Sequence, residues 1–398
     1  MTVRVGVEEE FHVLDAESGR LVPGAGAVLG RLRGSEFKPE LQRSAVEWNS
    51  SVHASLESLH ADLSGARRRL SAAASGLGLA VVAAGTVPFA RLTPGDTTPD
   101  RRYRSMAEEY RRVSDEHLVC SAQVHVDVPD RDTAVRLMCA VSPWLPPLLA
   151  LSASSPFWLG ADTGYASWRT MLWQRWPTAG PVGCFAGAAE YDAAVEGLIR
   201  SGVIKDSKMV YYDVRPCDHQ RTLELRVCDA CPRIETVVLV TGLFRALVED
   251  ERVRLERGQV CDGRHEWFRP AAWRAAQAGL EGTLVDPVTR LAAPAPAVLR
   301  DMLRRLRPAL EALGDWDTVR VLLEEALARG SVAGRLRGIA GEEGLAACVE
   351  TVVAETRGGH RQGPRRGSAP GAVRRPVAAS GAASPGASAP YSVESVGG

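Results

Sequence analysis

The sequence predicts an α+β fold in which helices back a mainly antiparallel sheet. Strand-like and helix-like segments are mixed along the chain without the regular alternation that is typical of a parallel sheet. The strand-like segments alternate apolar and polar side chains, as half-buried strands do. Four of them carry charged or histidine side chains on one face only. If these strands pair in one sheet, the charged faces merge into a single surface.

The first strand-like segment, residues 2–15, places acidic side chains on one face. Because alternate residues of a strand point to opposite faces, valines line one face, and the other holds Arg4, Glu8, Glu10 and His12. Two carboxylates two residues apart repel each other and stay ionised most easily beside cations, and hard divalent metals bind oxygen ligands. The alternative is a solvated face on an edge strand.

The three other strand-like segments repeat this arrangement. Opposite their apolar faces they carry His125 and Asp127 (residues 123–128), Tyr211, Asp213 and Arg215 (residues 210–215), and Glu224 and Arg226 (residues 223–227). Carboxylates and arginines on one sheet suit a metal–phosphate site, because carboxylates bind Mg²⁺ and arginines bind phosphoryl oxygens. The sequence has no Walker loop or dinucleotide fingerprint, so any nucleotide must be held by this sheet.

Apolar residues at helical spacing predict the elements between these strands. The predicted helical segments are residues 56–79, 100–118, 133–152, 235–257, 296–313 and 316–329.

Composition and charge are those of an ordinary globular protein. Of 398 residues, 45% are hydrophobic and 24% charged, and the formal net charge is zero, so nothing attracts the chain as a whole to nucleic acid or an anionic membrane. The chain enters a strand without a signal-peptide hydrophobic region and has no apolar run of about 18 residues. We therefore expect a cytoplasmic protein with no membrane span and no specific nucleic-acid partner.

The eight cysteines are sparse and scattered, unlike a secreted disulfide framework. Cys228 and Cys231 form a C-x-x-C, but no second pair completes a zinc site, so we expect two free thiols at a strand end. Four others are expected to be small core hydrophobes: Cys120, Cys139, Cys184 and Cys348.

The composition changes sharply near Arg357. Residues 357–398 are mostly Gly, Ala, Ser, Pro and Arg and cannot bury enough surface to offset the entropy lost on ordering. We predict a disordered basic tail over residues 357–398, after a globular domain over residues 1–356.

A series of motifs follows in order along residues 3 to 355. They include Gly6-Val-Glu-Glu-Glu-Phe11, Glu40-Leu-Gln-Arg-Ser-Ala-Val-Glu47, Ala84-Gly-Thr-Val-Pro-Phe89, the stretch from Leu151 to Arg169, Tyr212-Asp-Val-Arg-Pro216, Thr222-Leu-Glu-Leu-Arg-Val227 and the stretch from Gly279 to Pro287. In these motifs the chain resembles the carboxylate–amine ligases of the glutamate–cysteine ligase type 2 family. The resemblance implies that residues 1–356 form a glutamine synthetase-like catalytic domain, with a curved antiparallel sheet backed by helices.

The resemblance also implies a reaction and its cofactors, ATP and Mg²⁺ or Mn²⁺. ATP phosphorylates a substrate carboxylate, an amine attacks the acyl phosphate, and an amide forms; the family default is glutamate plus cysteine giving γ-glutamylcysteine. The partners implied are small amino-acid or amine substrates. By resemblance, the metal-binding positions are Glu8, Glu10, Glu40, Glu47, His125 and Glu224. Arg226, beside Glu224, falls on the arginine that contacts the transferred phosphate, and Arg169 and Arg215 are further phosphate or carboxylate contacts.

Three positions depart from the family pattern. Val87 replaces a usual His, Gln123 replaces the first His of a His-Val-His pair, and Asp127 replaces a frequent Gly. These changes spare the carboxylates, so we expect Val87 and Gln123 to mark a substrate pocket altered from the glutamate–cysteine default. Two alternatives stay open: a phosphagen-type kinase, which stops at phosphoryl transfer, and a metal–nucleotide binding protein that has lost catalysis.

Overall fold

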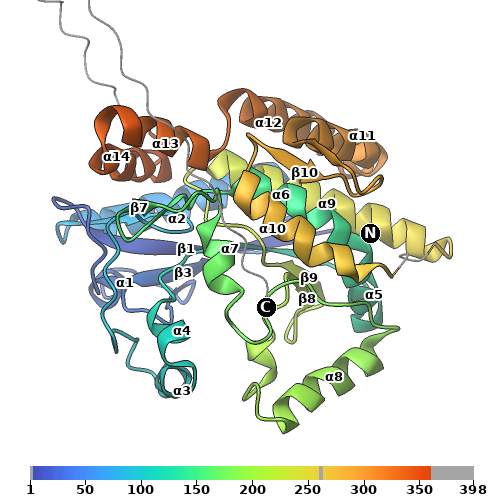
Figure 1. Ribbon diagram of the computed structural model, residues 1–398, viewed down its shortest axis with the longest axis horizontal. Helices are drawn as coiled ribbons and strands as arrows, with labels where there is room; N and C mark the ends of the chain where they lie inside the picture. The colour runs from blue at the N-terminus through green and yellow to red at the C-terminus, as the bar shows by residue number, and fades with distance from the viewer. Residues whose placement is uncertain (1–2, 260–262, 360–398) are drawn as a thin grey trace, which may run out of the picture. The chain divides into compact units, whose positions relative to one another are not determined.

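A seven-stranded antiparallel sheet forms the centre of the part of the chain that this computed structural model describes, residues 3–259 and 263–359 (Figure 1). The strand order is β2-β3-β1-β5-β9-β8, and β4 also pairs with β1. The strands are β1 (Val5–Asp15), β2 (Phe37–Pro39), β3 (Ala45–Asn49), β4 (Leu79–Val82), β5 (Ala122–Asp127), β8 (Val214–Pro216) and β9 (Thr222–Leu225). Two small hairpins lie outside this sheet: β6 (Phe157–Trp158) with β7 (Ala161–Asp162), and β10 (Thr283–Val285) with β11 (Ala292–Pro294).

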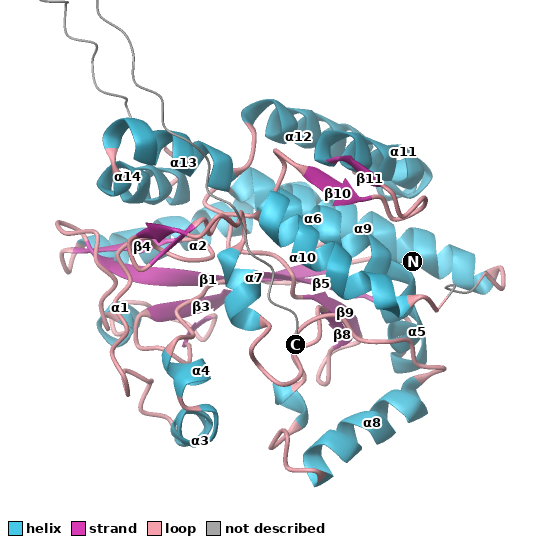
Figure 2. Ribbon diagram, viewed as in Figure 1, coloured by secondary structure: helices cyan, strands magenta, loops and turns pink. Residues whose placement is uncertain are grey.

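Helices surround the sheet, which confirms the predicted α+β class (Figure 2). In the view of Figure 1, α9 to α12 lie above the strands, and α3, α4 and α8 lie below them. The helices are α1 (Ala25–Leu29), α2 (Leu56–Ser75), α3 (Arg101–Tyr110), α4 (Arg112–Asp115), α5 (Arg131–Val141), α6 (Leu145–Ser152), α7 (Trp168–Trp173), α8 (Ala188–Arg200), α9 (Ile234–Glu256), α10 (Phe268–Ala278), α11 (Ala295–Leu313), α12 (Trp316–Arg329), α13 (Val332–Glu343) and α14 (Leu345–Thr356).

Apolar spacing predicted the long helices α2, α9, α11 and α12 with small errors at their ends. The predicted segment 100–118 is interrupted at Arg111, whose φ of 47° separates α3 from α4. The predicted segment 133–152 is interrupted by a 3₁₀ turn, Ser142–Trp144, because Pro143 lacks the N–H that a continuing helix needs.

The predicted strand at residues 210–215 is largely wrong, since only its end belongs to β8. The backbone before β8 pairs with a loop instead. The N–H of Tyr211 donates to Thr178 Oγ1 at 3.0 Å, and the N–H of Asp213 donates to the carbonyl of Gly180 at 3.0 Å. These bonds satisfy the backbone without a neighbouring strand, so alternation alone misjudged the segment.

Helices α2 and α9 supply the main core against the sheet. Val5, Val7 and Phe11 of β1 are buried in one apolar cluster with leucines of α2 and with most of α9. These residues share the apolar face that alternation predicts for β1. The opposite face of β1 therefore carries Glu8 and Glu10 away from these helices.

Glu9 is the one acid of β1 that points into this core, and a buried arginine neutralises it. Arg67 of α2 donates from Nε and Nη2 to the two carboxylate oxygens of Glu9 at 3.1 and 2.5 Å. It also donates to the carbonyls of Cys231 and Pro232, at 2.7 and 2.5 Å, just before α9. The two side chains are 2% and 1% exposed. One ion pair thus joins β1, α2 and the start of α9.

Val87 packs in a second apolar cluster, and the expectation that it marks the substrate pocket is wrong. It is fully buried, together with Leu14, Phe157 and residues of α13 and α14. An apolar side chain suits this environment, where an imidazole would need a hydrogen-bond partner. The departure from the family pattern at Val87 is therefore explained by packing.

Two of the cysteines expected to be core hydrophobes form a disulfide instead. Cys139 of α5 is bonded to Cys184, which is exposed in the loop before α8. Sequence could not indicate this pair, because the partners are 45 residues apart and bring no pattern of their own. Cys228 and Cys231 are free, as predicted, and both are buried.

One helical run, Arg131–Ser152, is long and apolar enough to cross a membrane by length and composition, contrary to expectation. Within the structure 83% of its most apolar window is buried, as in a core helix.

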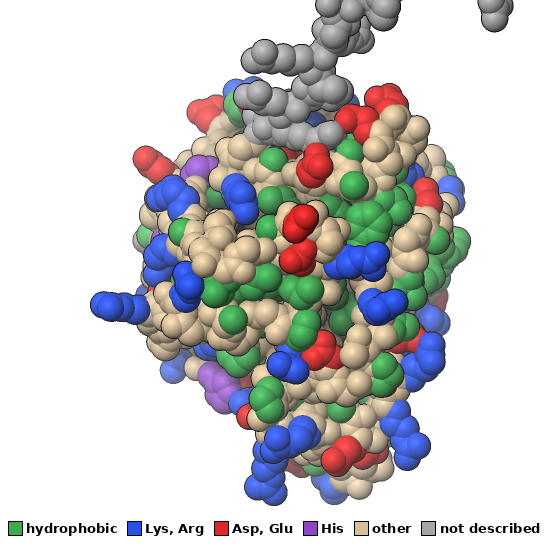
Figure 3. Space-filling model, turned by 90° about the vertical axis from the view of Figure 1, so that its left-hand side faces the viewer, with side chains coloured by type: hydrophobic (Ala, Val, Ile, Leu, Met, Phe, Trp, Pro, Cys, Tyr) green, Lys and Arg blue, Asp and Glu red, His purple; other side chains and the backbone are tan. Residues whose placement is uncertain are grey.

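Acidic and basic side chains are interspersed on the face shown in Figure 3. The prediction of a disordered tail concerns residues of which nearly all lie outside the described ranges.

Breaking the buried pair should strongly destabilise the fold. Arg67→Met leaves Glu9 as an uncompensated buried charge, which costs about 3–5 kcal/mol of unfolding free energy. Arg69→Met, two residues further along α2, removes an exposed pair with Glu36 and should cost at most about 1 kcal/mol. Urea unfolding of the two variants measures the difference; equal losses would contradict this account of Glu9.

Candidate active site

The register of the central strands brings the predicted acidic residues together on one face of the sheet. Glu10 of β1 is directly opposite Glu47 of β3, and His125 of β5 is directly opposite Glu224 of β9. Side chains paired in this way lie about 5 Å apart on the same face. Like charges so placed destabilise a sheet, so this surface requires neutralising partners.

Glu10, Glu40 and Glu47 form the first group. Each offers one carboxylate oxygen, and these oxygens lie within 4.8 Å of one another. Glu40 joins from the residue after β2, where the N–H of Leu41 donates to its Oε2 at 3.0 Å. The N–H of Ser121 donates to Glu10 Oε2 at 2.7 Å. The backbone thus holds two of the three carboxylates in place.

The protein's own cations do not balance this first group. Burial, with the neighbouring Glu47, raises the pKa of Glu10 to about 7, although Arg169 and Arg226 oppose the shift. Burial and the charges of Glu47 and Glu10 also raise the pKa of Glu40 well above its ordinary value. Three converging carboxylate oxygens are the ligands that Mg²⁺ and Mn²⁺ prefer, so the first group fits a divalent cation.

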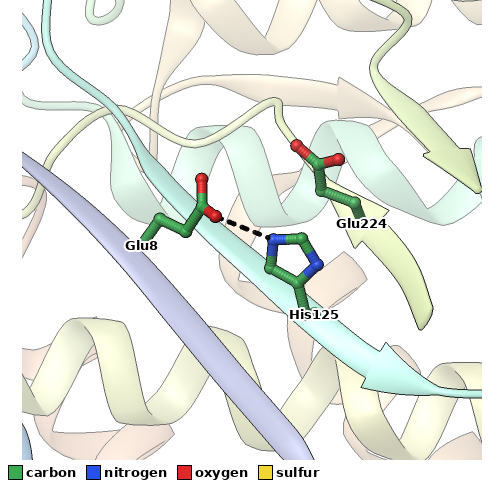
Figure 4. A group of neighbouring side chains, drawn as sticks. All are labelled: Glu8, His125 and Glu224. Carbon is green, nitrogen blue, oxygen red and sulfur yellow. Dashed lines mark ion pairs between the residues drawn. The ribbon is translucent and has the colours of Figure 1, made fainter. Parts of the chain in front are cut away.

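Glu8, His125 and Glu224 form the second group, again with ligand atoms within 4.8 Å of one another (Figure 4). His125 Nε2 lies 3.5 Å from Glu8 Oε1, and His125 Nδ1 lies 3.1 Å from Thr222 Oγ1. Burial lowers the pKa of His125, but the nearby Cys217 side chain and the charges of Glu8 and Glu224 outweigh this effect and raise the pKa to about 10. As an imidazolium, His125 balances the charge of Glu8.

Glu224 is balanced by two arginines. Arg215 donates to both of its oxygens, from Nε at 2.8 Å and from Nη2 at 3.2 Å, and Arg226 donates to Oε1 as well. Although burial opposes them, these guanidinium groups hold the pKa of Glu224 well below its usual range. The second group is therefore charge-balanced without a metal, and a metal there would have to displace the proton of His125.

Arg226 lies at the junction of the two groups. Its Nη1 also donates to Gln123 Oε1 at 2.5 Å, and Gln123 Nε2 donates to Glu10 Oε1 at 3.1 Å. Its guanidinium carbon lies 5.7 Å from the ring centre of Trp173 and 5.9 Å from that of Tyr211. Gln123 therefore belongs to the site, where it connects Arg226 with the first acidic group.

Arg169 contacts the backbone that carries Arg226. It is 3% exposed and donates to the carbonyls of Arg226 and Val227 at 3.2 Å each. Its role as a phosphate contact stays a prediction, and so do the metal-binding roles of the acidic residues. The structure gives Arg169 the contacts of a residue that holds this strand end.

Sequence reasoning missed the aromatic side of the site. Trp173 was not singled out, although it follows the long motif that ends at Arg169, and Trp176 begins the next family motif (residues 176–181) but was given no role. Trp176 donates from Nε1 to His117 Nδ1 at 3.1 Å, and both tryptophans pack against His117. No spacing in the sequence connects His117 with Trp173 and Trp176, which come 56 and 59 positions later in the chain.

Two solved structures resemble this fold closely enough to define its class. A bifunctional glutathione synthetase from Pasteurella multocida has a TM-score of 0.68 at 14% identity, covering 89% of this chain and 52% of that one. A glutamate–cysteine ligase from Francisella tularensis, solved in complex with AMP, has a TM-score of 0.66 at 10% identity, covering 90% and 88%. The fold is that of the glutamine synthetase-like ligases, as predicted.

The family follows from sequence. The chain belongs to glutamate-cysteine ligase family 2, whose family model matches residues 4–347. It is 53% identical to a Frankia casuarinae protein named "Putative glutamate--cysteine ligase 2-2", over 89% of this chain and 42% of that protein. A Mycolicibacterium smegmatis protein of the same name is 46% identical over 88% of this chain and 89% of its own length. The chain thus spans less than half the length of the Frankia relative.

Acid should weaken the fold through His117. Burial lowers its pKa to about 3, and Nδ1 must stay unprotonated to accept from Trp176. The unfolded chain takes up a proton near pH 6.5 and the folded chain does not, so stability is lost as pH falls through the window between 6.5 and 3. Between pH 6.5 and 4.5 the loss is about 2–3 kcal/mol.

His117→Asn keeps an acceptor in place of Nδ1 but cannot titrate. Urea unfolding at several pH values should give a flatter stability curve for this variant than for the wild type. Parallel curves for the two proteins would show that His117 does not carry the acid effect.

Proposed function

We propose that the protein is an ATP-dependent carboxylate–amine ligase, which forms an amide through an acyl phosphate. The observation that carries the proposal is the position of Arg226 between two groups of acidic residues in a member of this ligase family. An arginine so placed can donate two parallel hydrogen bonds to a phosphoryl group while the carboxylates hold a metal. The AMP complex of the Francisella ligase supports a nucleotide site in this fold.

The first acidic group would hold Mg²⁺ or Mn²⁺ through Glu10, Glu40 and Glu47. When bound, such a cation neutralises phosphate charge and orients phosphate oxygens. Glu8, His125 and Glu224 offer a second set of ligands if His125 loses its proton. Trp173 is 8% exposed beside Arg226 and helps to keep water from the phosphoryl group, which strengthens the arginine's electrostatic effect.

We propose small amino-acid or amine substrates, with glutamate and cysteine as the default pair, in the cytoplasm. The names of the relatives support this pair. The zero net charge supports a small-molecule substrate over nucleic acid. Gln123, which occupies the site in place of a histidine usual in the family, is the departure that contacts both Arg226 and Glu10 and can therefore alter the choice of substrate.

A screen of acids and amines, singly and in pairs, tests the reaction class. A ligase should release ADP and phosphate only when both an acid and an amine are present, with one amide formed per ADP. Release of ADP with a phosphorylated product and no amide would instead show a kinase. Nucleotide binding without ADP release under any pair would show a binding protein.

Arg226→Lys is the matched variant for this screen, since it keeps the charge but loses the planar fork. Its kcat should fall by about 10²–10³-fold, the cost of removing one positioned donor from a developing charge.

In the screen with the wild-type protein, the mass spectrum of the amide product identifies the acid and the amine that were joined.

The acidic group should make activity depend on a divalent metal. EDTA should abolish ADP release, and Glu47→Gln should raise the Mg²⁺ concentration for half-maximal activity by at least about tenfold, since it removes one of three ligands. Glu36→Gln, outside the group and paired with Arg69, is the control and should leave this concentration unchanged. Isothermal titration with Mn²⁺ gives the same comparison without turnover, and equal affinities in the two variants would exclude Glu47 as a ligand.

A further inference from the structure

Asp229, between the two cysteines of the C-x-x-C, is a carboxylate beside the site that accepts three hydrogen bonds from serines. It is fully buried. Its Oδ2 accepts from the N–H of Ser154 at 2.9 Å and from Ser155 Oγ at 2.6 Å, and its Oδ1 accepts from Ser167 Oγ at 2.7 Å. The serines come from the motif between Leu151 and Arg169, so this carboxylate organises that motif.

The same carboxylate faces Arg169. Arg169 Nη1 lies 3.9 Å from Asp229 Oδ1, with the two side chains 3% and 0% exposed. The backbone N–H of Arg169 donates to Ser155 Oγ at 3.1 Å, and Ser155 in turn donates to Asp229. Asp229 therefore holds Arg169 in two ways: Ser155 links it to the Arg169 backbone by hydrogen bonds, and its charge attracts the Arg169 guanidinium.

Arg169 passes this constraint to Arg226. Its two terminal nitrogens donate to the carbonyls of Arg226 and Val227, which fixes the backbone just past the end of β9. Because its backbone is fixed and its guanidinium bonds to Gln123 and Glu224, the Arg226 side chain is held in one orientation.

Asp229 also reaches the first acidic group. It forms an isolated antiparallel bridge with Ser121, whose N–H donates to Glu10 Oε2. The carboxylate has no room to shift toward Gly85, where a Cβ would lie 2.6 Å from it. Asp229 thus helps to position both Arg226, through Arg169, and Glu10, through Ser121.

We propose that Asp229 is a positioning residue for the transfer reaction, which sets Arg226 through Arg169; the proposal rests on the ligase function proposed above. Its carboxylate charge keeps the Arg169 guanidinium in the orientation that bonds both carbonyls. The charge matters beyond the hydrogen bonds, because serine hydroxyls can turn to satisfy a neutral amide while a buried guanidinium cannot replace its counter-ion.

Asp229→Asn tests the proposal, since it keeps the shape and removes the charge. Its kcat should fall by about 10–100-fold, with KM for ATP changed less than about threefold, because a displaced Arg226 loses contacts made in the transition state. Ser154→Ala is the structural control. Ser154 donates from Oγ to the Ala230 carbonyl at 2.7 Å and accepts the Gly85 N–H at 2.8 Å, so this variant should lower Tm and spare kcat.

A double-mutant cycle with Arg226→Lys separates positioning from a general loss of fold. If Asp229 acts through Arg226, Asp229→Asn should lower kcat less than about threefold in the Arg226→Lys background. Equal fold losses in both backgrounds, or an unchanged kcat in the single variant, would overturn the proposal. Should Asp229→Asn fail to fold, Arg169→Lys replaces it in the same cycle, since it keeps the charge beside Asp229 and loses the fork.

The same cycle is measured as Kd for ADP with Mg²⁺ and aluminium fluoride, which mimics the phosphoryl group during transfer and therefore reports transition-state contacts. Additive losses in Kd overturn the role of Asp229 whether or not the protein turns over. Absence of ADP release from the wild type counts against the ligase function alone, so the two failures are distinguishable.

Discussion

Three consecutive glutamates in β1 have to be neutralised on two faces of one sheet, and the rest of the fold is arranged around this constraint. Alternation sends Glu9 into the core, where Arg67 reaches it and also bonds the chain before α9. It sends Glu8 and Glu10 to the opposite face, where no helix of the core covers them. The buried ion pair fixes the register of β1, because a shift of one residue would move Glu8 and Glu10 into the core and Glu9 to the open face.

The two acidic groups on the open face solve the same problem differently. Glu224 and Glu8 are balanced by Arg215, Arg226 and the imidazolium of His125. Among the described residues no Lys or Arg forms an ion pair with the first group, and burial together with mutual repulsion raises the pKa values of Glu10 and Glu40. A divalent cation is the addition that would relieve this repulsion, and binding it would release protons. Charge balance therefore ranks the first group above the second as the metal site.

The sequence allowed the charged face to be predicted, but not how its members pair. Alternation assigned Glu8, Glu10, His125 and Glu224 to one surface correctly, because a strand has only two faces. Pairing depends on register between strands far apart in the chain, which periodicity does not contain. Family comparison misled at Val87, where an unusual residue reports on local packing. Asp229 has no pattern of its own in the sequence, since it lies within a C-x-x-C whose two cysteines indicate a metal site or free thiols.

Arg226 shows why such a site needs a large and rigid fold. Its guanidinium is held by Gln123 of β5 and Glu224 of β9, its backbone by Arg169 of α7, and Arg169 by Asp229. These contacts come from three separated parts of the chain, and each would be costly to leave unpaired in a buried setting. A single misplaced partner would displace the charge by a fraction of an ångström and lower transfer. The sheet and the buried pair of Asp229 and Arg169 thus locate one positive charge beside the carboxylates, where the proposed metal and phosphate would complete the charge balance.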